Sequence, residues 1–130
     1  MGLNPLARRS LAAGAALMLL GVALGAFGAH ALAERLTPRE LDVFRVGVNY
    51  QQWHALGLLL IGVLARDARD GRLLAWSACA LSTGIVLFSG SLYLLAAGAP
   101  RMVGAITPVG GLSFVAGWAL LLVYAVRSGR

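Results

Sequence analysis

LAAGAALMLLGVALGAFGAHAL, residues Leu11 to Leu32, is an unbroken run of 22 residues without one charged side chain. A helix rises 1.5 Å per residue, so this run covers about 33 Å, enough for a hydrocarbon core of roughly 30 Å. A strand of a membrane barrel would instead alternate apolar and polar residues over about ten positions. The run shows no such alternation, and it therefore predicts a transmembrane helix.

The composition extends this prediction to the whole chain. Of its 130 residues, 59% are hydrophobic and 12% are charged, and the mean hydropathy is +0.80. Soluble domains carry about 25% charged residues. In a bilayer the backbone must satisfy its own hydrogen bonds, which favours helices. We expect one integral membrane domain, residues 1–130, as an all-α, four-helix transmembrane bundle. Its predicted spans are residues 11–32, 50–65, 73–97 and 104–126.

Charge predicts orientation rather than a nucleic-acid partner. The net charge is +6 and the pI is near 11.1, but all eleven basic residues are arginines close to the predicted helix ends. Arginines in such positions set topology and meet lipid headgroups. With both termini in the cytoplasm, seven arginines lie on that side and four on the other. The positive-inside rule therefore favours cytoplasmic N- and C-termini.

A short helix is expected between the first two spans, over residues 38–49. Thr37 and Glu40 form a capping box, and Pro38 fits the first helical position. Leu41, Phe44 and Val48 fall on one side of this segment. We predict an amphipathic helix lying in the outer interface. A solvated loop helix is the alternative.

Polar residues cluster near the predicted outer membrane surface. His30 lies near the outer end of the first span, and His54 lies about one turn inside the predicted start of the second. The two imidazoles are therefore expected at a similar depth. The predicted polar cluster contains Glu34, His30, Tyr50, Gln51, His54, Ser89, Tyr93 and Thr107.

Several roles are open to this cluster. Polar side chains of this kind commonly anchor and join transmembrane helices, and that interpretation, which needs no cofactor, is favoured. His30 and His54 can alternatively ligate a haem. His30, Glu34 and His54 can hold a divalent metal ion. A quinone or lipid headgroup hydrogen-bonded by imidazole and phenol groups is the remaining ligand hypothesis.

Glycines predict close helix packing. Gly21, Gly25 and Gly28 form one stripe on the first span, and Gly111 lies in the fourth. Cys79, the single cysteine, is expected to be a small core residue. The chain has no HExxH, GxSxG or P-loop motif, so an enzyme is not predicted. A small-molecule transporter is the least favoured class, because no carboxylate lies near the predicted membrane centre.

Four blocks carry a family resemblance. They are GAFGAHAL (25–32), FRVGVNYQQWHALGLLLIG (44–62), LFSGSLYLL (87–95) and GAITPVGGLSFVAGW (104–118). In this order they resemble the YgdD-like small membrane proteins, the domain of unknown function 423, related in animals to transmembrane protein 256. The resemblance implies a four-helix protein of the bacterial inner membrane with no assigned activity or catalytic residue.

Two functional hypotheses follow. The leading one is a non-enzymatic accessory or scaffold protein that packs through its glycine faces against itself or a larger membrane complex. The second is a haem-, metal- or quinone-binding module built on the polar cluster. The lipid bilayer is an expected partner in both.

Overall fold

The computed structural model describes residues 2–128, which form four long helical rods and no strand. The first rod is α1 (Pro5–Phe27) extended by a π-helical turn, η1 (Gly28–Leu32), and the second is α2 (Pro38–Ala65). The third joins α3 (Arg72–Gly84), the π-helical turn η2 (Ile85–Ser89) and α4 (Gly90–Ala96). The fourth joins the 3₁₀ turn η3 (Arg101–Ala105) to α5 (Ile106–Ser128). The all-α prediction is confirmed.

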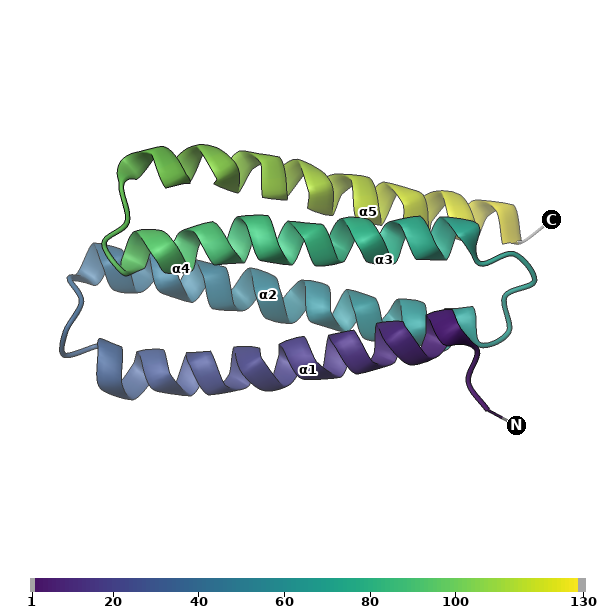
Figure 1. Ribbon diagram of the computed structural model, residues 1–130, viewed down its shortest axis with the longest axis horizontal. Coiled ribbons are helices and arrows are strands. Elements are labelled where there is room, and N and C mark those ends of the chain that lie inside the picture. The colour runs from purple at the N-terminus through teal and green to yellow at the C-terminus, as the bar shows by residue number, and fades with distance from the viewer. Residues whose placement is uncertain (1, 129–130) are drawn as a thin grey trace.

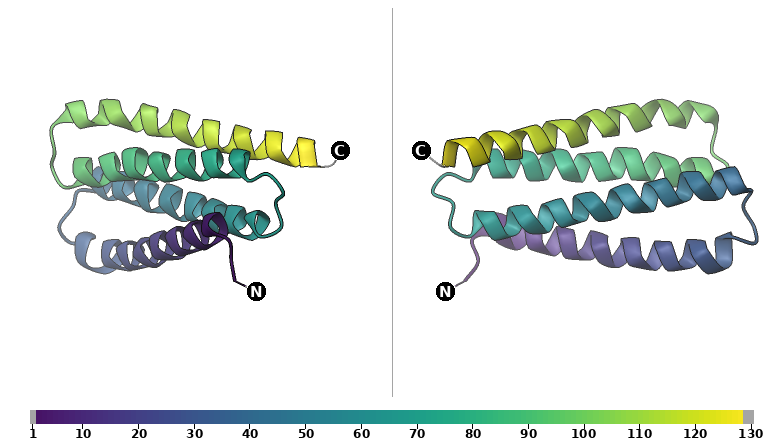
Figure 2. Two further views of the ribbon diagram at one scale, coloured as in Figure 1. Left: turned by 45° about the vertical axis from the view of Figure 1, so that its right-hand side comes forward. Right: turned by 180° about the vertical axis from the view of Figure 1, so that it is seen from behind.

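The rods run alternately up and down, so both termini lie at one end (Figure 1). The α1 rod packs along α2, and α5 packs along the α3–η2–α4 rod, which also contacts α2. The α1 and α5 rods therefore flank the two central rods, as the further views in Figure 2 also show.

Local signals set the starts of the first two rods. The Asn4 side chain accepts a hydrogen bond from the backbone N–H of Ala7 and caps α1. Thr37 and Glu40 form the reciprocal capping box of α2, with Thr37 Oγ1 accepting from the Glu40 N–H at 3.3 Å. Each bond satisfies a backbone donor that the first helical turn leaves unpaired. The predicted helix start at Pro38 is confirmed.

The expected interfacial helix over residues 38–49 is instead the first part of α2, which continues unbroken to Ala65. Its apolar side is buried within the bundle. Phe44 lies against the Tyr93 ring, with centroids 5.3 Å apart, and a Cβ on Gly28 would come within 2.6 Å of the Phe44 ring. The amphipathic pattern was correctly identified, but the apolar face packs against protein rather than lipid.

Three rods are long and apolar enough to cross a membrane: Pro5–Leu32, Arg72–Ala96 and Arg101–Ser128. The α2 helix is not among them by composition, because the polar residues 49–54 interrupt its apolar sequence. It nevertheless contributes 12 buried residues, against four each from α1, α3 and α5. Neighbouring helices thus shelter Gln51 and His54, the two buried polar side chains of α2.

The main core lies between α2, α3 and α5. Leu58, Ile61, Leu74 and Leu81 are its most deeply buried large side chains, and each is at most 1% exposed. Cys79 is exposed, so its predicted place in the core is wrong. It lies on the side of α3 away from Leu74 and Leu81, where Trp76 is also exposed. Exposed apolar side chains of this kind suit a lipid-facing surface.

Candidate functional site

Gln51 lies at the centre of the polar side chains inside the bundle. Its side chain is 2% exposed and bridges two neighbouring rods. The Tyr93 hydroxyl donates to Gln51 Oε1 at 2.7 Å, and Gln51 Nε2 donates to the Leu17 carbonyl at 2.8 Å. Both ends of the Gln51 amide are therefore occupied by the protein itself.

Ser89 joins α2 to the third rod in the same way. It ends the π-helical turn η2, is fully buried, and donates from Oγ to the Gly47 carbonyl at 2.7 Å. Gly47 permits this approach, because a Cβ there would lie 2.8 Å from the Tyr93 ring. π-helical turns often occur at functional sites, but here the Ser89 hydroxyl is engaged with backbone.

His54 is buried in a cluster of aromatic rings. Its Nδ1 lies 2.6 Å from the Tyr50 carbonyl oxygen, which can only accept, so Nδ1 carries the proton. The imidazole stacks on Phe114, with ring centroids 3.4 Å apart and planes 10° apart. Tyr50 stacks in turn on Phe88 at 4.4 Å. Within residues 2–128, His54 Nε2 makes no hydrogen bond, which distinguishes it from the amide of Gln51.

Ser77, Ser91 and Ser113, which the sequence analysis did not single out, form similar bonds, and Ser91 does so with Thr107 of the predicted cluster. Ser77 donates to the Gly117 carbonyl and Ser113 to the Ala80 carbonyl, both at 2.7 Å, which joins α3 to α5. The Ser91 and Thr107 hydroxyls share a hydrogen bond of 2.6 Å. Across the described part of the chain, every side-chain nitrogen or oxygen that is itself fully inaccessible has a hydrogen-bond partner, so His54 Nε2, which has none, keeps some accessible surface. The sequence could have indicated these bonds only through the presence of a serine in an apolar helix. Such a serine identifies the hydrogen-bond donor but not the backbone carbonyl that accepts.

The structure does not place the two histidines at a similar depth. His30 is exposed in η1. His54 is buried in α2, 16 residues after the first residue of that helix, Pro38. The contact of Gln51 with Leu17 sets the register of α2 against α1. His30 lies 13 residues beyond Leu17, a rise of about 20 Å. The expectation assumed that the second span starts near Tyr50, but the helix starts at Pro38.

This separation bears on the ligand hypotheses. Glu34 is exposed beyond η1, and the described residues contain no group of three histidine, cysteine, aspartate or glutamate side chains able to hold a metal ion. The predicted metal set of His30, Glu34 and His54 is therefore not brought together. A haem ligated by His30 and His54 does not fit either, because both imidazoles must reach one iron atom.

The predicted packing glycines lie mainly inside the molecule. Gly21 and Gly28 face α2, where a Cβ would come within 2.9 Å of Gln52 and 2.6 Å of Phe44 respectively. Gly25 has more room, with Val48 at 3.5 Å, and Gly111 lies 3.9 Å from Phe88. The stripe on α1 is thus covered by α2.

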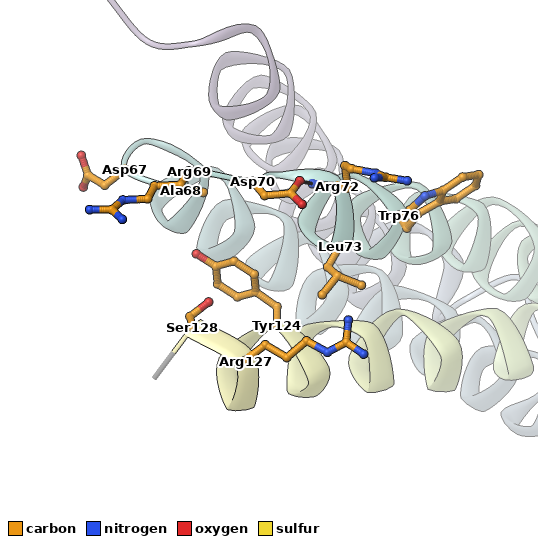
Figure 3. Close-up of a pocket in the computed structure, with 10 residues that line it drawn as sticks. All are labelled: Asp67, Ala68, Arg69, Asp70, Arg72, Leu73, Trp76, Tyr124, Arg127 and Ser128. Carbon is orange, nitrogen blue, oxygen red and sulfur yellow. Dashed lines mark hydrogen bonds between the residues drawn. The ribbon is translucent and has the colours of Figure 1, made fainter. Parts of the chain in front are cut away.

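Each end of the bundle carries an open hollow of about 710 Å³. The hollow at the end that holds both termini lies between the α2–α3 loop, the start of α3 and the end of α5 (Figure 3). The hollow at the opposite end lies between the start of α2 and the loop after α4, and it is lined by Thr37, Arg39, Glu40, Val43, Leu95, Ala96 and Arg101.

Comparison with known proteins assigns the family. The model of the family described as "Protein of unknown function (DUF423)" matches residues 24–111. The chain belongs to the DUF423 family. Its polar residues from His30 to Thr107, including the Gln51–Tyr93 pair, fall inside the matched region.

Relatives of this DUF423 protein are named as membrane proteins. The UPF0382 inner membrane protein YgdD of Escherichia coli (strain K12) is 48% identical over 109 residues, which cover 84% of this chain and 82% of the relative. The UPF0382 membrane protein YwdK of Bacillus subtilis (strain 168) is 42% identical over 114 residues, 88% of this chain and 93% of the relative. No solved structure matches the chain. With its three apolar rods, the chain is a membrane protein of a family of unknown function.

Proposed function

We propose that this protein is a non-enzymatic accessory or scaffold subunit in the bacterial inner membrane. The observation that supports the proposal is the use of its interior polar groups. Gln51, Ser77 and Ser89 each donate to a backbone carbonyl of another rod. Interhelical hydrogen bonds of this type hold transmembrane helices together. These side chains therefore act as structural cross-links between the rods.

The contact surface of such a scaffold differs from the one the glycines suggested. Gly21 and Gly28 pack inside the molecule, so they do not present a surface to a partner. The outer sides of the rods remain available. On α5, Leu112, Val115 and Leu122 are each at least 65% exposed, whereas Phe114 is buried. We propose that contact with a second copy or another membrane protein uses these apolar outer sides.

The proposed orientation places both termini in the cytoplasm. Both lie at one end of the bundle, next to the arginine-rich α2–α3 loop. Within residues 2–128 the two ends carry six and four arginines, and the richer end is expected on the cytoplasmic side. Cysteine accessibility provides the check, in a Cys79→Ala background with single cysteines at Ala68 and Ala99. We expect an impermeant thiol reagent applied to intact cells to label position 99 and not position 68.

Site-specific photo-cross-linking tests the scaffold role. A photoreactive residue is placed in turn at Leu112 and Leu122 on α5, at Val86 in η2 of the third rod and at Leu19 on α1, all of them exposed. If the protein is a scaffold, cross-links to one protein partner concentrate on one of these three sides, because a docked helix covers a single face. Lipid adducts alone at all four positions would contradict the proposal. A buried position, Leu81, serves as the control that should give no external adduct.

One observation favours a second candidate, the binding of a hydrogen-bond-donating ligand such as a quinol. The His54 side chain is buried, with 6% of its surface exposed, and its Nε2 has no hydrogen bond within residues 2–128. A neutral imidazole protonated on Nδ1 is an acceptor at Nε2. Mass spectrometry of the extract from protein purified in mild detergent tests this candidate. A stoichiometric quinol, recovered as such or as the quinone formed when it oxidises during extraction, that is present with the wild type and lost in His54→Phe would favour ligand binding over the scaffold role.

A further inference from the structure

The hollow beside the chain termini joins a charged rim to an apolar wall. Its rim comes from the loop around Arg69 and from the two helix ends. Figure 3 shows the Tyr124 ring rising from α5 toward the loop, and Leu73 pointing from α3 toward α5. Its lining residues are Asp67, Ala68, Arg69, Asp70, Arg72, Leu73, Trp76, Tyr124, Arg127 and Ser128.

The rim carries three arginines that form no ion pair with any residue of the described range 2–128. Arg69, Arg72 and Arg127 are all exposed. Within residues 2–128 the only salt bridge joins Arg45 to Asp42 at the other end of the bundle. Of the two carboxylates in the lining, Asp70 accepts a hydrogen bond from the Arg72 backbone N–H at 3.0 Å. Asp70 therefore binds the backbone N–H of the first residue of α3 and forms no ion pair with an arginine within residues 2–128.

The apolar wall distinguishes a lipid from a small anion. Trp76 is 66% exposed at the edge of the hollow, and Val86 is 68% exposed further along the same rod. Such an exposed apolar path suits an acyl chain, while a guanidinium above it suits a phosphate. Tryptophan and tyrosine also favour the level of the headgroups. A free anion would use the arginines but would gain nothing from Trp76.

We propose that this hollow binds the headgroup of an anionic phospholipid, with its phosphate at the rim to which Arg69, Arg72 and Arg127 contribute charge and its glycerol and acyl region along Leu73 and Trp76. Basic pockets between transmembrane helices are a known mode of headgroup recognition. The site is independent of the scaffold role and of the identity of any protein partner.

Native mass spectrometry of the full chain in mixed micelles with equimolar phosphatidylglycerol and phosphatidylcholine tests the proposal. We expect the wild type to retain phosphatidylglycerol preferentially. The triple variant Arg69→Gln/Arg72→Gln/Arg127→Gln should lower the affinity for phosphatidylglycerol by about 100-fold, since each arginine near a membrane surface contributes a factor of about five. Trp76→Ala should weaken retention of both lipids and leave the preference between them unchanged.

The opposite hollow supplies a matched control of equal volume. Arg39→Gln/Arg101→Gln removes its two arginines and should leave the preference for phosphatidylglycerol intact. An equal loss in this control variant would overturn the proposal, because it would reduce the effect to net charge. Displacement of the lipid by excess inorganic phosphate would overturn it in favour of a free-anion site. If the glutamine variant does not fold, Arg69→Lys/Arg72→Lys/Arg127→Lys is used instead. This variant keeps the three positive charges and should prefer phosphatidylglycerol over phosphatidylcholine, as the wild type does.

Discussion

The hydrogen bond from Tyr93 to Gln51 should contribute measurably to the stability of the bundle. The bond joins α4 to α2, and Gln51 is almost fully buried. Tyr93→Phe removes the donor, keeps the ring against Phe44, and leaves Gln51 Oε1 without its partner. An unsatisfied buried group costs about 1–3 kcal/mol, and interhelical hydrogen bonds in membranes average about 0.6 kcal/mol. We expect a loss of about 1 kcal/mol in the free energy of unfolding.

The second variant sets the scale of the network. Gln51→Leu removes two hydrogen bonds, one from Tyr93 and one to the Leu17 carbonyl. At up to about 1.7 kcal/mol for each bond, the expected loss is about 1–3 kcal/mol. Because both single variants break the same bond, the double variant should lose less than their sum. We expect a coupling energy of about 0.5–1.5 kcal/mol between Gln51 and Tyr93.

Reversible unfolding by sodium dodecyl sulfate in mixed micelles, followed by tryptophan fluorescence, measures these losses. Tyr50→Phe is the matched control, because the Tyr50 hydroxyl makes no hydrogen bond within residues 2–128. Its free energy of unfolding should change by less than about 0.5 kcal/mol. A stabilising Tyr93–Gln51 hydrogen bond is refuted if Tyr93→Phe is no more costly than Tyr50→Phe, or if the losses of the Gln51 and Tyr93 variants are additive.

Two further changes test packing and capping. Gly110→Ala should lower the free energy of unfolding by about 1–3 kcal/mol, because its Cβ would lie against the backbone of Phe88. Gly90→Ala, with no atom within 4 Å of the new Cβ, is the control and should be neutral or stabilising by up to about 1 kcal/mol. Equal effects of the two variants in the same unfolding assay would contradict the packing of Gly110 on Phe88. Thr37→Ala should cost about 1 kcal/mol and speed amide hydrogen exchange at Glu40 in the first turn of α2, and unchanged exchange would speak against the capping box.

Local patterns were reliable where a single segment contained the whole signal. The box formed by Thr37 and Glu40 correctly predicted the start of α2, because its two hydrogen bonds join residues three positions apart. The amphipathic side of residues 38–49 was also visible. The surface against which this side packs was not visible in the sequence, because Phe44 contacts Gly28 and Tyr93, which are distant along the chain.

The candidate site was predicted only in part for the same reason. The sequence indicated that Gln51, Ser89 and Tyr93 belong to one region, and the structure joins Gln51 to Tyr93 and places both Ser89 and Tyr93 against Gly47. It did not indicate that the partners of Ser89 and Gln51 are backbone carbonyls. Every residue has a carbonyl, so an acceptor of this kind leaves no signature in the sequence.

Membrane character, helical class and the number of rods followed from the amino-acid sequence, because apolar runs of membrane-spanning length restrict the backbone to helices. The depth of each polar side chain in the bundle, and the residues that it contacts, were decided only by the packing of the rods. His54 lies deeper in the bundle than His30, contrary to expectation, because α2 already packs against the other rods from Pro38 onward. Gly21 and Gly28 of α1 are buried because Gln52 and Phe44 pack on them. Helix register is set by interlocking side chains on separate rods, and such contacts exist only once the rods come together.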